Sequence, residues 1–135
     1  MATIRTETSI EAPAQHAWDA VRDVGAIHLR LAPGFVLDTR LEGDTRVVTF
    51  ANGVVVRERI VTIDDAARRL AYAIIEGSAS FHSAAIQILP EGADRCRLVW
   101  IADLLPDSLA PRFEAMMQQG TALMKRTMES AAAGN

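Results

Sequence analysis

Short β-rich segments follow one another closely through the middle of this chain, with only a few turn-forming residues between them. The segments are rich in Val and Ile, and the residues between them include Asn52-Gly53, a pair typical of tight hairpins. Connections this short cannot make the crossover that parallel strands require, so successive strands must pair antiparallel. The predicted strands of this meander are residues 35–41, 46–51, 54–63, 70–76, 81–89 and 95–104.

A further strand and two short helices precede the meander. Residues 3–10 are rich in Thr and Ile and alternate in polarity, which predicts a strand. After Pro13 the apolar residues recur at helical spacing as far as Gly25, so this segment is expected to form a helix. Residues 27–31 predict a second short helix, which ends before Pro33.

One long amphipathic helix follows the meander. After Pro106 the helical period returns and continues to about Ser130, and residues 131–135 form a tail. The chain therefore predicts a single α+β domain spanning residues 1–135, in which seven antiparallel strands pack against a long C-terminal helix. The apolar stripe of that helix consists of Leu109, Phe113, Met116, Met117, Gly120, Leu123, Met124 and Thr127.

The composition excludes several classes of protein. Of the 135 residues, 50% are apolar and 23% are charged, which is typical of a folded chain and not of a disordered one. The 14 Lys and Arg residues are scattered and outnumbered by 17 Asp and Glu residues, which argues against nucleic-acid binding. No apolar run of about 18 residues is present, so no membrane span is expected.

Cysteine and histidine usage gives no sign of a disulfide or a metal site. Cys96 is the single cysteine, and His16, His28 and His82 lack the spacing of a zinc motif. The glycine-rich dinucleotide pattern, the P-loop pattern and the GxSxG elbow of hydrolases are also missing. We therefore expect no metal and no cofactor. The N-terminus lacks the pattern of a signal peptide, so a cytoplasmic protein is expected.

Short sequences distributed over nearly the whole chain carry a family resemblance. They are Ile10-Glu11-Ala12-Pro13, Ala17-Trp18, Val21-Arg22-Asp23, Leu31-Ala32-Pro33-Gly34, Val56-Arg57-Glu58-Arg59-Ile60, Asp64-Asp65, Gln87-Ile88-Leu89-Pro90 and Leu98-Val99-Trp100. In this order, together with the predicted elements, they resemble the START-like superfamily, also called SRPBCC or birch-pollen-allergen-like. Within it, the sequence is similar to the polyketide cyclase/dehydrase type and to the plant abscisic acid receptors.

The resemblance implies a helix-grip fold, in which a curved sheet wraps around the last helix and leaves an internal cavity. Members bind hydrophobic small molecules there, and they include carriers, hormone receptors, aromatase/cyclases and subunits of larger enzymes. The fold alone therefore does not assign a reaction. The long gate loop of the plant receptors is reduced here to Ala51-Asn52-Gly53, so neither a hormone-style lid nor a phosphatase partner is expected.

Glu58 is the first candidate site residue, because alternation places it on the apolar face of its strand with Val56 and Ile60. A buried carboxylate is costly unless it is paired or hydrated. Glu58 is therefore either a functional group or a structural one, held in an internal ion pair or in a water-filled cavity that requires no chemistry. The resemblance favours the cavity, since Glu58 matches a glutamate that faces the pocket of the plant receptors.

Tyr72 and His82 are candidates on neighbouring strands. By alternation Tyr72 shares a face with Ile74, and His82 shares one with Ile86. Each is either a hydrogen-bonded core residue or a residue that presents a polar atom to a ligand. With Glu58 they supply a carboxylate, a phenol and an imidazole, a set able to perform general acid–base chemistry on a keto or enol substrate.

The remaining candidates come from the helices and from apolar strand positions. His28 falls near a basic group with which the plant receptors bind a ligand carboxylate, and a solvent-exposed helix-end histidine is the alternative. Gly120 makes room in the long helix either for a strand or for a ligand. Residues 95–104 are apolar on both faces, which leaves their orientation open. The full set of expected ligand contacts is His28, Val56, Glu58, Tyr72, Ile74, His82, Ile86, Phe113, Met117, Gly120 and Met124.

The leading hypothesis is a protein that binds or carries a small hydrophobic or amphipathic molecule between the sheet and the long helix. The alternative is a polyketide cyclase, aromatase or dehydratase with Glu58, Tyr72 and His82 as catalytic residues. A third class, a subunit that assists assembly of a larger complex, would instead show an exposed apolar patch. A monomer or a homodimer is compatible with each of them.

Overall fold

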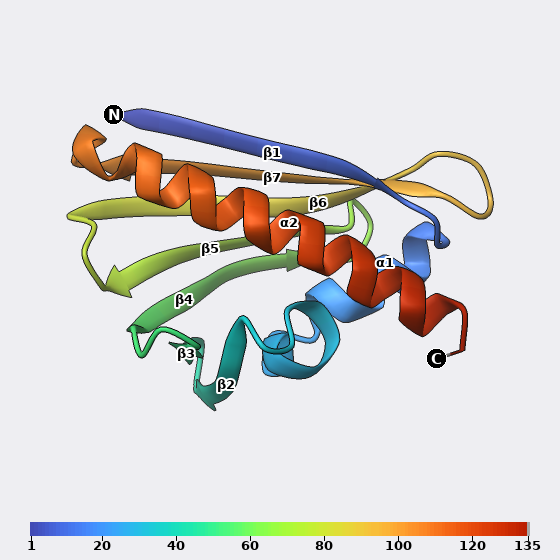
Figure 1. Cartoon of the computed structure of the whole chain (residues 1–135), viewed down its shortest axis with the longest axis horizontal. Coiled ribbons are helices and arrows are strands. Elements are labelled where there is room, and N and C mark those ends of the chain that lie inside the picture. The colour runs from blue at the N-terminus through green and yellow to red at the C-terminus, as the bar shows by residue number, and fades with distance from the viewer. Residues whose placement is uncertain (135) are drawn as a thin grey trace.

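Seven antiparallel strands form one curved sheet around the C-terminal helix α2 (Figure 1), in a computed structural model that describes residues 1–134. The predicted α+β helix-grip architecture is confirmed, and every predicted strand lies within one residue of its observed bounds. Asn135, the last residue of the expected domain and tail, lies outside the described residues. The strands are β1 (Ala2–Ile10), β2 (Val36–Glu42), β3 (Thr45–Phe50), β4 (Val55–Asp64), β5 (Arg69–Glu76), β6 (Phe81–Pro90) and β7 (Cys96–Leu105).

The helical elements follow the expected order. The helix α1 (Ala14–Arg22) and the short π-helical turn η1 (Ile27–Leu31) lie between β1 and β2, where the sequence predicts two short helices. A 3-10 turn, η2 (Asp107–Leu109), leads into the long helix α2 (Ala110–Ala132). This helix continues two residues beyond Ser130, the end expected from the sequence, and crosses the concave face of the sheet (Figure 1).

The sheet order is β1-β7-β6-β5-β4-β3-β2, so the chain from β2 to β7 is an uninterrupted meander and β1 joins it beside β7. The pairing of β4 with β5 shifts register between Arg57 and Glu58, and again between Ile60 and Thr62. Such irregularities bend a strand and increase its twist. They help this part of the sheet to curve beneath α2.

The inward face of β7 carries Leu98, Trp100 and Leu104, which are buried, whereas Ile101 is partly exposed on the outer face. This resolves the orientation that the sequence left open. Gly120 of α2 lies over this strand, and a Cβ atom at Gly120 would be 3.2 Å from Cζ3 of Trp100. Gly120 therefore makes room for a strand side chain, and any larger residue would push Trp100 away from the helix.

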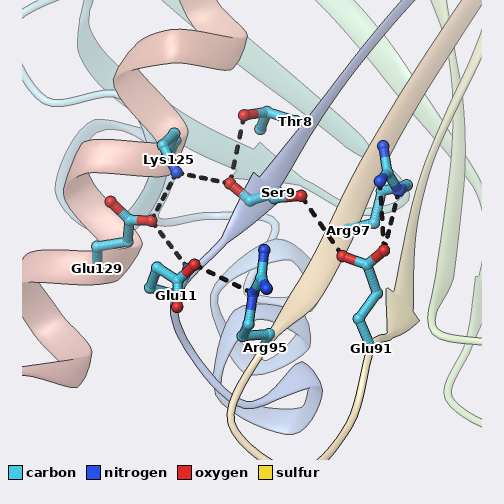
Figure 2. A network of polar contacts seen from close by, with 8 residues as sticks. All are labelled: Thr8, Ser9, Glu11, Glu91, Arg95, Arg97, Lys125 and Glu129. Carbon is cyan, nitrogen blue, oxygen red and sulfur yellow. Dashed lines mark hydrogen bonds and ion pairs between the residues drawn. The ribbon is translucent and has the colours of Figure 1, made fainter.

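A polar network ties the C-terminal end of α2 to the end of β1 and to the β6–β7 hairpin (Figure 2). Lys125 Nζ donates to the carbonyl oxygen of Ser9 at 2.7 Å and pairs with Glu129 at 2.8 Å. Glu129 Oε2 also accepts the backbone N–H of Glu11 at 2.8 Å, and the Glu11 carboxylate pairs with Arg95 at 3.0 Å. We call this region the fastened end of the molecule.

Within residues 1–134, no helix combines the length and the apolar character that a membrane crossing requires.

Candidate functional site

A cavity of about 440 Å³ lies between the N-terminal half of α2 and the inner face of the sheet. Its mouth is marked by exposed residues on three elements: Asn52 in the β3–β4 turn, Ser78 in the β5–β6 turn, and Arg112 and Gln119 on α2. The opening is thus at the opposite end of α2 from the fastened end. The apolar and aromatic side chains of its wall include Phe35, Phe50, Val54, Val56, Ile74, Trp100, Ala102, Phe113, Met116 and Met117.

His82 lies where the sheet opens beneath α2. The backbone pairing of β5 with β6 ends at Tyr72 and Ala84, although both strands continue beyond that point. There, Nδ1 of His82 takes the place of a backbone carbonyl and accepts a hydrogen bond from the N–H of Ile74 at 3.0 Å. The imidazole thus replaces one backbone hydrogen bond of the β5–β6 pairing, and this contact sets the orientation of the ring.

The same contact sets the protonation of His82. Because Nδ1 accepts a hydrogen bond, the ring proton resides on Nε2, which has no acceptor among residues 1–134. The residue is only 5% exposed, and burial lowers the pKa of His82 to about 4. At neutral pH it is therefore an uncharged hydrogen-bond donor on the cavity wall, with the rings of Tyr72 and Phe113 centred 5.7 and 5.8 Å away.

Tyr72 presents a second donor beside His82. Its hydroxyl oxygen accepts a hydrogen bond from Nε1 of Trp100 at 3.0 Å, which leaves the hydroxyl proton available to another acceptor. Burial raises the pKa of Tyr72 well above its ordinary value, so the phenol stays protonated. The side chain lines the cavity and is buried.

Glu58 is buried on the inner face and forms an ion pair with Arg46, its direct neighbour across the β3–β4 pairing. Nε of Arg46 lies 2.7 Å from Oε1 of Glu58, and the two side chains are 4% and 8% exposed. The guanidinium also lies over the ring of Tyr72, 5.0 Å from its centroid. Of the two readings that the sequence left open for Glu58, an internal ion pair is present, and its partner is Arg46.

A second, smaller cavity of about 50 Å³ lies deeper in the molecule. Arg46, Glu58, Tyr72 and Trp100 all line it, and the last three also line the larger cavity. Its volume has room for about one or two water molecules. The ion pair and the Tyr72–Trp100 hydrogen bond therefore form a polar wall between a ligand-sized cavity and a small inner space.

The structure distributes the sequence-predicted contact residues over both cavities. Val56, Glu58, Tyr72, Ile74, His82, Phe113 and Met117 line the larger one, whereas Glu58, Tyr72, Ile86, Gly120 and Met124 line the smaller one.

His28 lines neither cavity. It lies in η1, half-buried, and its Nδ1 atom has no hydrogen-bond partner among residues 1–134. The structure therefore offers no support for the expectation, derived from the plant receptors, that His28 binds a ligand carboxylate.

Several residues of the site were missed by the sequence analysis. Arg46 alternates with Val48 and Phe50, and this parity would have placed it on the inner face opposite Glu58. Trp100 was missed because both faces of its strand are apolar, so alternation carried no signal. Phe35, Asn52 and Ser78 lie outside the strands, where periodicity does not indicate direction. Arg112 and Gln119 lie on α2 off its apolar stripe, where the helical period does not distinguish the rim of a cavity from open surface.

No group of three or more His, Cys, Asp or Glu side chains suited to hold a metal ion occurs within the described part of the chain.

Solved structures with this fold come from several organisms. An uncharacterized protein from Bacillus thuringiensis superposes with a TM-score of 0.85 at 15% identity, covering 94% of this chain and 98% of that one. Norcoclaurine synthase from Thalictrum flavum, in complex with dopamine and hydroxybenzaldehyde, superposes with a TM-score of 0.75 at 20% identity, covering 99% of this chain and 87% of that one. A START superfamily protein from Mycobacterium smegmatis superposes with a TM-score of 0.76 at 10% identity, covering 98% of this chain and 97% of that one. At these identities the likeness shows the fold alone.

At the level of sequence, comparison with curated proteins gives no match. The family comparison is positive: residues 1–132 match the profile described as polyketide cyclase/dehydrase and lipid transport. Because this match spans nearly the whole chain, the protein belongs to the polyketide cyclase/dehydrase and lipid transport family.

Proposed function

We propose that this protein binds and carries a small hydrophobic molecule in the cavity beneath α2. The observation that supports this most directly is the cavity itself, whose volume of about 440 Å³ falls within the range of small-molecule sites. Its wall combines many apolar and aromatic side chains with a few converging polar groups, which is the usual composition of such sites.

The buried polar groups indicate what the molecule carries. Nε2–H of His82 and the hydroxyl of Tyr72 are both available donors on the cavity wall. Burying a donor without a partner is unfavourable, so a ligand that supplies an acceptor is preferred over a pure hydrocarbon. We therefore expect a carbonyl, ether or hydroxyl oxygen in the part of the ligand that lies deepest.

Binding without turnover is favoured over acid–base catalysis by the state of the three polar residues. Glu58 is already engaged by Arg46, and the raised pKa of Tyr72 disfavours its phenolate. His82 uses Nδ1 to hold Ile74, and its lowered pKa makes it a poor proton acceptor at neutral pH. Three groups able to titrate thus act as fixed hydrogen-bonding groups.

The alternative activity is that of a polyketide cyclase, aromatase or dehydratase, and one observation favours it. Two donors on one wall, His82 and Tyr72, would polarise the same carbonyl group of a keto substrate if it reached both. Turnover of a poly-β-keto surrogate by the wild type, and its loss in Tyr72→Phe, would support this alternative. Binding without turnover would exclude it for that substrate.

The proposed binding is tested with N-phenylnaphthylamine, a neutral aromatic probe whose fluorescence rises in apolar surroundings. We expect saturable binding to the wild type. Ala115→Trp places an indole at the cavity mouth and should weaken binding by about tenfold or more, a change of about 1.4 kcal/mol. Ala122→Trp is the matched control, because Ala122 is also exposed on α2 but lies outside the cavity and should leave binding unchanged.

Two results would contradict the proposal. One is a wild type that does not bind the probe. The other is equal binding by the Ala115 and Ala122 variants, which would place the probe elsewhere on the surface. Circular dichroism and thermal unfolding of both variants verify that they are folded, as expected for substitutions at exposed helix positions.

A further inference from the structure

We propose that the ligand is an amphipathic aromatic acid, whose rings occupy the cavity and whose anionic group binds Arg112 at the mouth. This rests on the proposed function and adds to it the chemical class of the ligand and the residue that selects for it.

The balance of charge around the cavity favours an anionic ligand. Among the described residues that line it, only Glu58 and Arg112 carry a formal charge at neutral pH. The charge of Glu58 is compensated by Arg46, at 2.7 Å. Arg112 forms no ion pair and no side-chain hydrogen bond with any of residues 1–134, and it is exposed at the rim. The cavity therefore has one uncompensated charge, which is positive and stands at its entrance.

Polar groups accompany Arg112 at the mouth of the cavity. Asn52 lies at the same mouth, and its Oδ1 atom already accepts the N–H of Val54 at 3.0 Å, which leaves its amide N–H groups as donors. Ser78 and Gln119 also line the opening. A guanidinium with neighbouring donors matches the oxygen atoms of a carboxylate or sulfonate. A cationic ligand would be repelled by the unpaired positive charge of Arg112 there.

The interior of the cavity is largely aromatic. Five aromatic residues line the cavity, and two of them, Phe35 and Phe50, form an edge-to-face pair with centroids 5.6 Å apart. Flat rings are well matched to such walls. Arg112 and Phe113 are adjacent in α2, and the ring of Phe113 is centred 5.8 Å from that of His82, so one side chain of the wall separates the rim arginine from an interior donor. The other aromatic residues of the wall are Tyr72 and Trp100.

An isolated arginine at the surface does not by itself indicate an anion site, and α2 offers a direct comparison. Arg126 is also exposed on α2 and also lacks an ion pair among residues 1–134, but it lies beside a shallow surface groove outside the aromatic cavity. If position at the cavity mouth is what matters, substituting Arg112 and Arg126 must give different results.

The experiment uses two probes that share their ring system. Anilinonaphthalene sulfonate carries a sulfonate that N-phenylnaphthylamine lacks, so the ratio of their two affinities isolates the contribution of the negative charge. We expect the wild type to prefer the sulfonate, and Arg112→Gln to lower this ratio by about tenfold, the scale of one partly exposed charged hydrogen bond. Arg126→Gln should leave the ratio unchanged. Added salt should reduce the preference of the wild type and not that of Arg112→Gln.

The possible outcomes separate this inference from the proposed function. If the neutral probe does not bind the wild type, the proposed function fails. If it binds but Arg112→Gln changes the ratio no more than Arg126→Gln does, the cavity binds small molecules and the anion preference is wrong. Displacement of the neutral probe by naphthylacetate, but not by its methyl ester, would extend the result from sulfonates to carboxylates. Equal displacement by both would overturn the inference for carboxylates.

Discussion

The two halves of α2 are held against the same sheet in opposite ways. At the fastened end, Met124 and Met128 are buried, and Lys125 and Glu129 bond to β1 and the segment that follows it. Over the cavity, the inner face of α2 instead borders an open volume, and Met116 is only half-buried. The C-terminal half of α2 supplies packing and polar contacts, whereas the N-terminal half supplies a wall of the cavity.

This difference explains how the fold tolerates a cavity. A void of about 440 Å³ deprives its lining of dispersion contacts that a close-packed core would make. The fold therefore depends on regions that border no cavity, such as the last turns of α2 around Met128, which is buried and lines neither cavity. The comparison predicts that equivalent substitutions will have unequal effects at the two ends.

The largest expected effect is on the polar wall behind the cavity. Arg46→Met leaves the buried carboxylate of Glu58 without a partner and should lower the free energy of unfolding by about 3–5 kcal/mol. The double variant with Glu58→Leu should be less destabilised than this single variant, because no charge then stays buried. Denaturant unfolding measures both, with Arg40→Met, in the exposed pair Arg40–Glu42, as the control with little effect. Additive losses would show that the pair is not coupled.

The second effect compares two methionines of α2 directly. Met128→Ala creates a void in a packed region, where Met128 is 1% exposed, and should cost about 2–5 kcal/mol. Met116→Ala removes a half-buried side chain from the cavity wall, and should cost about 1 kcal/mol or less, because the space beside it is already open. Equal losses in thermal or denaturant unfolding would contradict the difference between the two ends.

The strands and the long helix were predictable because their periodicities differ and their turns are short. Alternation correctly placed Glu58, Tyr72 and His82 on the inner face, and each of them is buried there. What each side chain does was not predictable, since it depends on contacts between strands. The hydrogen bond between His82 and Ile74 exists only because the β5–β6 pairing ends early. No local sequence pattern indicates where that pairing ends.

Arg46 and Arg112 illustrate two further limits of sequence reasoning. Arg46 shares strand parity with Val48 and Phe50, which indicates the inner face, but only the register of β3 against β4 shows that Arg46 meets Glu58. Arg112 lies in the first turn of α2, where helical period distinguishes the sheet side from the solvent side but not the rim of a cavity from open surface. The roles of both residues are therefore visible only in the three-dimensional structure.

The third prediction concerns pH and the cavity end alone. The pKa of His82 is lowered to about 4 in the folded protein, against about 6.5 in an unfolded chain. Between these values the unfolded state binds more protons, so stability is complete above about pH 6.5 and decreases as the pH falls toward 4, by about 2–3 kcal/mol. His82→Asn retains an acceptor for the N–H of Ile74 but does not titrate. The free energy of unfolding of this variant should therefore lack the decrease between about pH 6.5 and 4 that His82 causes. Identical pH profiles of the two proteins would refute the assignment.

The smallest effect is expected at the fastened end, from Glu129→Gln. The hydrogen bond from Lys125, and after it the one from the backbone N–H of Glu11, holds the pKa of Glu129 below its ordinary value. Its contribution to stability is therefore present above the unfolded pKa and is lost as the pH falls through the folded one. Because the pair is partly exposed, the loss at neutral pH should stay below about 1 kcal/mol and shrink in high salt. Amide hydrogen exchange shows where this stability is lost. If the polar network acts locally, exchange in Glu129→Gln should be faster in the last turns of α2 and unchanged in the turns over the cavity. A uniform increase along α2 would mean that the two ends are not held independently.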